Sequence, residues 1–312
     1  MTTAEATVGR VRAPHRRRGL SERQLAGAML SPSLIVIAVV AAYPIGYAIW
    51  LSLNQYSVRV PGLSRWVGLD NYLDALKSSD FWNAFKTTFI FTGISVSLEL
   101  VLGLGMALLM HESFKGRGIL RATVLVPWAV LTVGTAIMWR SIFEPDLGFA
   151  NQVLDALGLP GGHVVWLGQS GYALAVMIFA DVWKTAPFMA LLILAGLQVI
   201  PNDVYDAAKV DGATAWQRFT RITLPLLKPA ILVALIFRTL DALRIFDLPF
   251  VLTKGANDTE TLSLQAYQTL TQDRLVGQGS ALAVLTFIIV MAVSLLYIRF
   301  VGGNIRTLSE DT

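Results

Sequence analysis

The sequence predicts an all-α integral membrane protein with six transmembrane helices. Of its 312 residues, 54% are hydrophobic and only 15% are charged, and the mean hydropathy of +0.59 exceeds that of an ordinary soluble domain. Six apolar stretches are each long enough to cross a hydrocarbon core of about 30 Å, which requires about 20 helical residues. The chain therefore divides into a membrane domain at 29–301 and two polar tails, 1–28 and 302–312. The six expected spans lie near residues 29–51, 87–109, 119–139, 172–197, 230–252 and 281–301.

The first 28 residues are expected to form a basic tail and a short surface helix. Five arginines between positions 10 and 18 come without apolar periodicity, and the capping-box pair Ser21 and Gln24 predicts a helix leading into the first span. A basic tail could bind nucleic acid, but beside a membrane span it is better explained as an orientation signal. The apolar run from Met29 to Leu53 is longer than the about 7–15 residues of a signal-peptide core and lacks a small-residue cleavage site. We therefore expect an uncleaved span.

The distribution of lysine and arginine sets the expected orientation. Fifteen of the 25 lysines and arginines lie in the two tails and in the loops after spans two and four. This count includes Arg121 and Arg299, which lie at the ends of their spans. The other three loops hold seven and the spans hold three. Because positive residues are retained on the cytoplasmic side, we expect both termini and the loop at 202–229 to be cytoplasmic.

The loop at 202–229 is the main polar interruption in this apolar chain, and its first half predicts a helix followed by a sharp turn. Asn202 or Asp203 is a suitable N-cap for a helix that runs through Lys209. Gly212 suits the left-handed conformation in which a helix stops and the chain changes direction.

The second half of the loop predicts another short helix. Thr214 and Gln217 have the spacing of a capping box, so this helix is expected to run to about Ile222. Pro225 and Pro229 each remove a backbone donor and disfavour helix just before them, so we expect the element to end there.

This loop resembles a known family. Its pattern is similar to the EAA loop of permease subunits of binding-protein-dependent ABC importers for carbohydrates, of the maltose, trehalose and glycerol-phosphate type. Asp206 stands where that family usually has glutamate, and taken alone the loop could also be an ordinary amphipathic connection between two spans. The likeness continues in order along about residues 25–299. The segments that carry it are Asp206-Ala207-Ala208, Gly212 and Ile222-Thr223-Leu224-Pro225 in the loop, and Leu125–Trp128, Trp183–Phe188, Gly196–Pro201, Phe246-Asp247 and Thr259–Leu262 outside it.

The resemblance implies a type I ABC importer permease fold in a bacterial cell membrane. It implies a second homologous permease, two ATPase subunits that carry ATP and Mg, and a solute-binding protein that meets the outer loops; it implies no nucleic acid. Whether the two permeases are identical is left open. The residues expected to couple to the ATPase are Asp206, Ala207, Ala208, Gly212, Ala213, Thr214 and Trp216.

Seven charged residues inside the expected spans stand out, apart from Arg121 and Arg299 at the ends of their spans. A charge at mid-membrane costs roughly 2.5–3.5 kcal/mol on insertion scales, so such residues are paired or functional. On the fifth span four of them recur every three residues with alternating sign, so they can pair as successive neighbours. Two interpretations stay open, a structural ladder of ion pairs or the lining of a translocation cavity. The seven are Glu99, Asp181, Lys184, Arg238, Asp241, Arg244 and Asp247.

The resemblance also implies where a sugar is bound. Carboxylates and hydroxyls can hydrogen-bond sugar hydroxyls, and an aromatic ring can cover the apolar face of a pyranose. Glu99, on the second span, is interpreted instead as an interhelical hydrogen-bonding residue. The expected substrate-binding residues are Asp181, Lys184, Thr185 and Phe188 on the fourth span, and Asp241, Ala242, Arg244 and Ile245 on the fifth.

The sequence lacks the motifs that several other functions require. The sequence has no Gly-x-x-x-x-Gly-Lys-Ser/Thr loop to hold nucleotide phosphates, no cysteine, and no metal-ligand spacing among its three histidines. The chain is therefore expected to be a transport subunit without its own ATPase site, metal or cofactor. An ion-coupled secondary sugar carrier is the first alternative, since charged spans also suit proton relays, and a membrane glycosyltransferase is the second. The identity of the sugar stays open.

Overall fold

The computed structural model describes residues 21–58, 64–158 and 164–310. The chain separates into two compact units, residues 1–47 and 48–312. In the first unit, α1 (Glu22–Ile37) opens with the predicted capping box, in which Ser21 accepts from the Gln24 amide at 3.4 Å. It continues through a π-helical turn (Ala38–Ala42) into α2 (Tyr43–Ser52). Nearly every side chain of 29–47 is exposed although the stretch is apolar on all sides, as expected for a helix surrounded by lipid.

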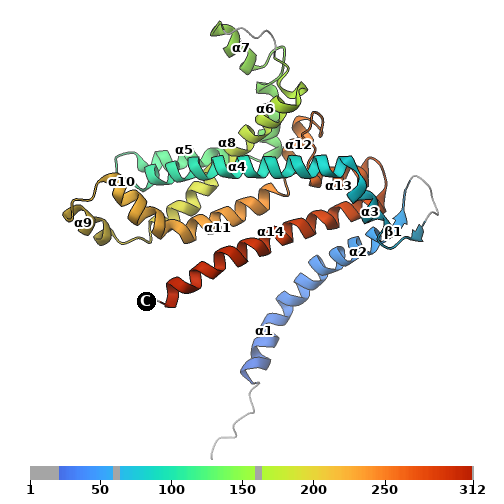
Figure 1. The fold of residues 1–312 in the computed structure, drawn as a ribbon, viewed down its shortest axis with the longest axis horizontal. Coiled ribbons are helices and arrows are strands. Elements are labelled where there is room, and N and C mark those ends of the chain that lie inside the picture. The colour runs from blue at the N-terminus through green and yellow to red at the C-terminus, as the bar shows by residue number, and fades with distance from the viewer. Residues whose placement is uncertain (1–20, 59–63, 159–163, 311–312) are drawn as a thin grey trace, which may run out of the picture. The chain divides into compact units, whose positions relative to one another are not determined.

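In the described part of the second unit, the regular elements are helices and one pair of short strands, β1 and β2, which pair antiparallel. Figure 1 shows the order of its elements. They are β1 (Asn54–Tyr56), β2 (Ser64–Trp66), α3 (Asp70–Lys77), α4 (Ser79–His111), α5 (Arg117–Ala129), α6 (Thr132–Ile142), α7 (Phe149–Ala156), η2 (Trp166–Gly168), α8 (Ser170–Leu197), α9 (Asn202–Val210), α10 (Ala215–Arg218), η3 (Phe219–Thr223), α11 (Leu224–Ala242), α12 (Asp247–Leu252), α13 (Leu262–Thr271) and α14 (Val276–Glu310).

Five helical segments among the described residues are long and apolar enough to cross a membrane. A sixth candidate is the pair α5 and α6, which is bent by 89° between Ala129 and Thr132. The stretch expected as a straight third span therefore contains a bend, and the expected fifth span is interrupted after Ala242, before α12 begins at Asp247. The apolar content of a stretch indicates how long a helix the lipid can surround. It does not show where the backbone turns.

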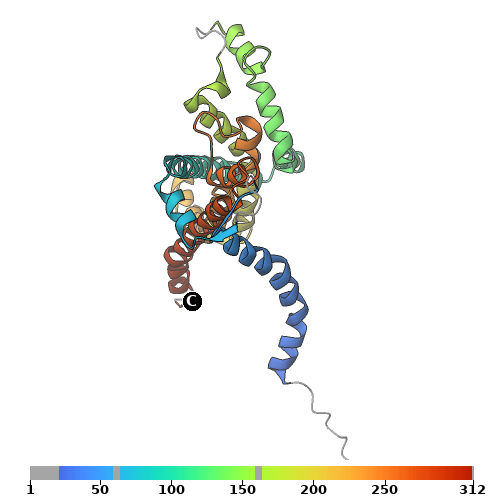
Figure 2. The ribbon, with the colours of Figure 1, turned by 90° about the vertical axis from the view of Figure 1, so that its right-hand side faces the viewer.

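Helix α8 lies at the centre of the second unit and packs against α4, α5 and α11. Both views show α4, α8 and α11 close together, while α6 and α7 project from this group (Figures 1 and 2). Gly196 allows α8 to approach α11 closely, because a Cβ at this position would lie only 2.4 Å from the Cβ of Ala230. The core around α8 includes the fully buried Phe91, Met189 and Ile193.

The polar loop at 202–229 folds partly as expected. Gly212 has φ +75°, and Thr214 forms the predicted capping box with Gln217. The predicted side-chain N-cap is wrong, because α9 already includes Asn202 and takes the backbone of Pro201 as its N-cap.

The predicted end of the second helix is also wrong. Helix α10 does not stop near Ile222 but continues through the π-helical turn η3 directly into α11, which contains Pro225 and Pro229. Pro225 lies in the first turn of α11, just after the wider π-helical turn, where the loss of one backbone donor is tolerated. The loop therefore joins α11 without a break.

Candidate functional site

A network of buried charges joins three helices at the centre of the second unit. Arg238 of α11 donates from Nε and Nη2 to the two carboxylate oxygens of Glu99 on α4, at 2.6 and 2.8 Å. Its Nη2 also donates to Asp181 of α8 at 2.9 Å, and its Nη1 donates to Asp241 at 2.5 Å. One guanidinium therefore holds three carboxylates, and we call these four residues the ion network.

The members of the ion network differ sharply in exposure. Arg238 is 2% exposed, and Glu99 is completely buried. The side chain of Asp241 is 69% exposed, although it bonds the same guanidinium. Of the three carboxylates, Asp241 is therefore the one whose free oxygen atoms can accept hydrogen bonds from a polar molecule outside the protein.

Thr185 extends the network but has little capacity left for a substrate. Its hydroxyl lies 2.7 Å from Glu99 Oε1 and 2.6 Å from the backbone oxygen of Asp181. A hydroxyl carries one proton, so donation to either oxygen leaves none for a sugar. The residue is also only 8% exposed.

The other residues expected to contact the sugar on α8 and α11 differ in how exposed their side chains are. Phe188 is half-buried and stacks on Trp128 of α5, with ring centroids 5.8 Å apart and planes 14° apart. Lys184 is half-buried, whereas Ala242 is fully packed in the core. Ile245 lies beyond the end of α11, where its backbone oxygen accepts from Thr261. The structure thus offers Phe188 and Lys184, but not the side chain of Ala242, to an external ligand.

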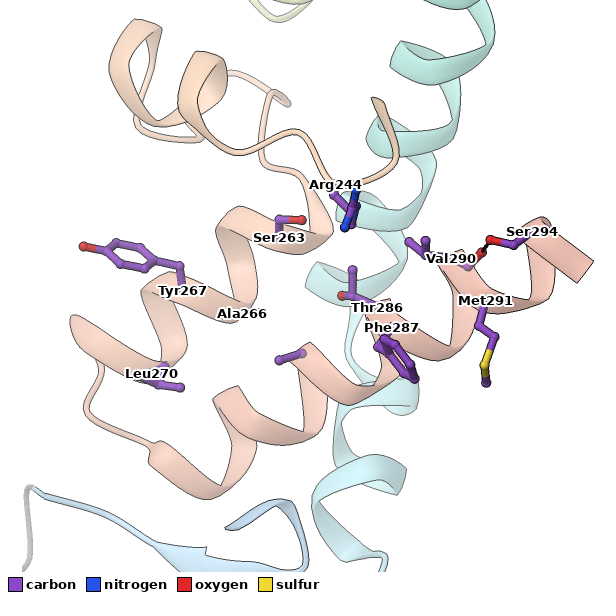
Figure 3. Close-up of a pocket in the computed structure, with 11 residues that line it drawn as sticks. Arg244, Ser263, Ala266, Tyr267, Leu270, Thr286, Phe287, Val290, Met291 and Ser294 are labelled. Atoms are coloured by element: carbon purple, nitrogen blue, oxygen red, sulfur yellow. Dashed lines mark hydrogen bonds between the residues drawn. The ribbon is translucent and has the colours of Figure 1, made fainter. Parts of the chain in front are cut away.

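Arg244 does not belong to the ion network. Its Nε donates to the Leu240 oxygen at 3.1 Å, and its side chain lines a largely apolar groove of about 570 Å³ with residues of α13 and α14 (Figure 3). No ion pair joins Arg244 to Asp241 or Asp247 in the part of the chain that the structure describes. Of the two interpretations left open, the ladder of ion pairs therefore applies only to its first pair, because α11 ends at Ala242 before the spacing can continue.

A second candidate site is the surface of the loop formed by α9 and α10, at one end of α4 (Figure 1). The turn between the helices is closed by the Ala213 amide, which donates to the Ala208 oxygen at 2.9 Å. Arg218 donates to the Ala213 oxygen at 2.8 Å, and Ala208 is packed inward. This turn is therefore fixed by hydrogen bonds from both sides.

The outer face of this loop exposes two large apolar side chains. Val210 and Trp216 are 88% and 71% exposed, on either side of the Gly212 turn. Asp206 is also exposed and forms an ion pair with Lys209 at 2.8 Å. Exposed large side chains beside a rigid turn are suited to insertion into a cleft of another protein.

The reasoning from sequence missed two parts of the site. It identified Glu99 as an interhelical residue but did not assign its partner, Arg238, which is 139 residues away. It also missed Trp128 as the ring that supports Phe188. The sequence did contain a signal for the pair of Glu99 and Arg238, namely one acidic and one basic residue on different expected spans. This signal alone does not show that the two residues pair.

Long apolar helices around a buried polar centre define a polytopic membrane protein with a polar site between its helices, as transporters have. Residues 99–306 match the family described as the binding-protein-dependent transport system inner membrane component. This chain belongs to that family. It is thus a permease subunit of an ABC importer, whose ATPase is a separate subunit.

Curated proteins similar to this chain include permeases named for sugar transport. The trehalose transport system permease protein SugA of Mycobacterium tuberculosis is 42% identical over 284 residues, 91% of each chain. The trehalose/maltose transport system permease protein MalF of Thermococcus litoralis is 44% identical over 280 residues, covering 89% of this chain and 94% of that protein.

A similar solved structure comes from a bacterial importer of the acidic polysaccharide alginate. One chain of it matches with a TM-score of 0.77 and 27% identity, over 89% of this chain and 94% of that chain. A second structure of the alginate transporter contains a periplasmic protein with bound alginate pentasaccharide, and matches with a TM-score of 0.78 and 26% identity over 88% and 93%.

Proposed function

We propose that this chain is one of two permease subunits of an ATP-driven importer for a disaccharide of the trehalose or maltose type. The names of the relatives at 42% and 44% identity support this substrate class. The distribution of lysine and arginine supports a bacterial cell-membrane protein with both termini in the cytoplasm. A solute-binding protein delivers the sugar from outside, as the alginate complex suggests by analogy.

The sugar is held beside the exposed side of the ion network. Asp241 accepts hydrogen bonds from sugar hydroxyls, and Phe188, held in place by Trp128, covers an apolar sugar face. Lys184 lies on the same helix as Phe188 and donates to sugar oxygens. Asp181 and Thr185 act through the network by holding Arg238 and Glu99 in place.

Coupling to ATP hydrolysis runs through α9 and α10. The single observation that carries this proposal is the unbroken helical path from Ala215 through η3 to Ala242, which ends beside Asp241. ATP and Mg are bound by the two partner ATPase subunits. When the ATPases close, they displace the exposed Gly212 turn and Trp216, and α11 transmits this displacement to the ion network. The spans then alternate between inward-open and outward-open arrangements around the sugar.

The test is uptake of radiolabelled trehalose by proteoliposomes that contain both permeases, the ATPase and the binding protein. We expect uptake only when ATP is present on the side of the vesicle membrane that carries the ATPase subunits. Asp241→Asn should raise the sugar concentration needed for half-maximal uptake about tenfold, since a weaker acceptor replaces a charged one. Asp155→Asn, an exposed change on α7, is the matched control and should behave like the wild type.

Two results would overturn the proposal. Uptake that persists without the ATPase, driven by a proton or sodium gradient, would show an ion-coupled secondary carrier. Turnover of a lipid-linked sugar by the isolated subunit would show a membrane glycosyltransferase.

A further inference from the structure

The buried part of the ion network contains more acidic than basic groups. Arg238 supplies one cation, and it contacts Glu99 of α4 and Asp181 of α8, which are 0% and 3% exposed. The third acidic partner, Asp241, is largely exposed to solvent and does not belong to this buried group. One buried cation therefore faces two buried acidic side chains, in the region where α4, α8 and α11 lie close together (Figure 1).

The surroundings of Asp181 do not neutralise the second acidic group. Among the described residues, the charged groups that act on it are Arg238, Glu99 and Asp241. Lys184 is the next charged residue on α8, but no ion pair joins it to Asp181 in the described part of the chain. Helices α5, α6 and α12 also pack against α8, and none of their described charged side chains forms an ion pair with Asp181. The described residues likewise include no group of acidic or histidine side chains that could hold a metal ion.

The two buried acidic side chains lie close enough to share a proton. Nη2 of Arg238 donates to both of them, to Glu99 Oε1 at 2.8 Å and to Asp181 Oδ2 at 2.9 Å. The two side chains are also within hydrogen-bonding reach of each other. Ionised carboxylates only accept hydrogen bonds, so a bond between these two groups requires a proton on one of them. Like charges at such short range also oppose ionisation of both groups.

The hydrogen-bond donors are distributed unequally between the two groups. Both oxygens of Glu99 accept from Arg238, and its Oε1 also lies 2.7 Å from the Thr185 hydroxyl. The carboxyl group of Asp181 accepts one hydrogen bond from the described residues, the bond from Nη2 of Arg238. Donors stabilise the ionised form of a carboxyl group, so this arrangement favours the proton on Asp181 over the proton on Glu99.

We propose that Glu99 and Asp181 bind one proton between them at neutral pH, held on the Asp181 side. With one negative charge on the pair and one positive charge on Arg238, the buried part of the ion network is then electrically neutral. An excess charge buried away from water is strongly unfavourable, and uptake of a proton removes it. The proton site needs neither sugar nor ATP, so it is tested in the assembled complex of permeases and ATPase without either ligand.

Infrared difference spectroscopy at neutral pH tests for the proton directly. The difference between the wild type and Asp181→Asn should contain the carbonyl stretching band of a protonated carboxylic acid, which an ionised carboxylate lacks. Asp155→Asn, which removes an exposed carboxyl group on α7, is the matched control, and its difference spectrum should lack this band. A spectrum in which Asp181→Asn removes only carboxylate bands would overturn the proposal.

Thermal unfolding of the same complexes gives a second readout. The amide of Asp181→Asn has the shape of the protonated acid, so its midpoint should stay within about 4 °C of the wild type. Glu99→Gln replaces the acceptor of two arginine nitrogens and should lower the midpoint by about 10 °C. A larger loss in Asp181→Asn than in Glu99→Gln would contradict the proposed position of the proton.

The dependence of the midpoint on pH separates a bound proton from a purely structural role of Asp181. The folded wild type holds a proton that the unfolded chain releases at neutral pH, so its stability should fall as the pH rises. In Asp181→Asn this fall should be at least about twofold smaller, because the amide carries no titrating proton. The same pH dependence in both proteins would overturn the proposal.

Discussion

Arg238 holds the central side chains of the site in one arrangement. It is 2% exposed and faces three carboxylates, two of which are buried with it. Moving a charge out of water is costly, and the cost is recovered only when the partners are close and well oriented. The distances of 2.6 and 2.8 Å from its nitrogens to Glu99 meet that condition. Arg238 is therefore committed to structure, and Asp241 is left as the exposed member of the network.

Removing this guanidinium should destabilise the subunit more than any surface change. In Arg238→Gln the carboxylates of Glu99 and Asp181 lose their counter-ion in a buried place, so we expect a loss of about 3–5 kcal/mol in folding free energy. Thermal unfolding of the complex in detergent, followed by size-exclusion chromatography, measures this effect. Arg244→Gln is the matched control and should change the midpoint little, since Arg244 is exposed and outside the network.

Neutralising the partners should restore part of the loss. Combining Arg238→Gln with Glu99→Gln and Asp181→Asn leaves hydrogen-bonding groups without net charge. If the triple variant is no more stable than Arg238→Gln alone, unpaired charge is not the cause of the destabilisation.

At the scale of single residues, the sequence identified the right charges but not their partners. Four charges every three residues along one stretch suggested local pairing, and only the pair of Arg238 and Asp241 forms. The buried partners of Arg238 are Glu99 on α4 and Asp181 on α8. Such contacts depend on how each helix is rotated about its axis, and apolar composition does not specify that rotation.

At the scale of elements, three local signals were confirmed, whereas the side-chain N-cap predicted at Asn202 or Asp203 and the proline break were wrong. The capping boxes at Ser21 and Thr214 and the left-handed Gly212 depend on neighbouring residues, and all three are present. The proline break failed because the π-helical turn before Pro225 accommodates the missing donor within a continuous helix. As a result, the α9–α10 turn is attached to α11 as one element.

Gly212→Ala should weaken coupling without preventing assembly. A Cβ at this position meets no atom within 4 Å, so the cost comes only from the left-handed backbone at φ +75°, about 1–2 kcal/mol. The strain should shift the turn and reduce sugar uptake per ATP hydrolysed, and Gly212→Glu, which adds a charged side chain at the same turn, should reduce it further. The ratio of uptake to hydrolysis in proteoliposomes is the measurement.

Gly105→Ala is the matched control for this prediction. Gly105 lies in α4 with ordinary helical geometry, and a Cβ there also meets nothing within 4 Å. A similar drop in both variants would mean that loss of glycine flexibility in general, and not the turn, is responsible.

At the scale of the whole molecule, the sequence predicted the class of protein from the amount and length of its apolar stretches. It could not show that α5 and α6 meet at 89° or that the path after Ala242 is interrupted. The orientation in the membrane is a property of the surroundings, so it is inferred from charge counts. The proposed coupling depends on this orientation.

The orientation can be tested directly because the chain contains no cysteine. Asp211→Cys places a thiol in the exposed turn after α9, and Asp155→Cys places one on exposed α7. Helix α8 lies between these positions and has 28 residues, about 42 Å, which is long enough to separate the two sides of a membrane. A membrane-impermeant maleimide should label Asp155→Cys in intact cells, and Asp211→Cys only after permeabilisation. The reverse pattern would place the α9–α10 loop outside the cell, where it cannot reach an ATPase, and labelling of both in intact cells would show that α8 does not cross the membrane.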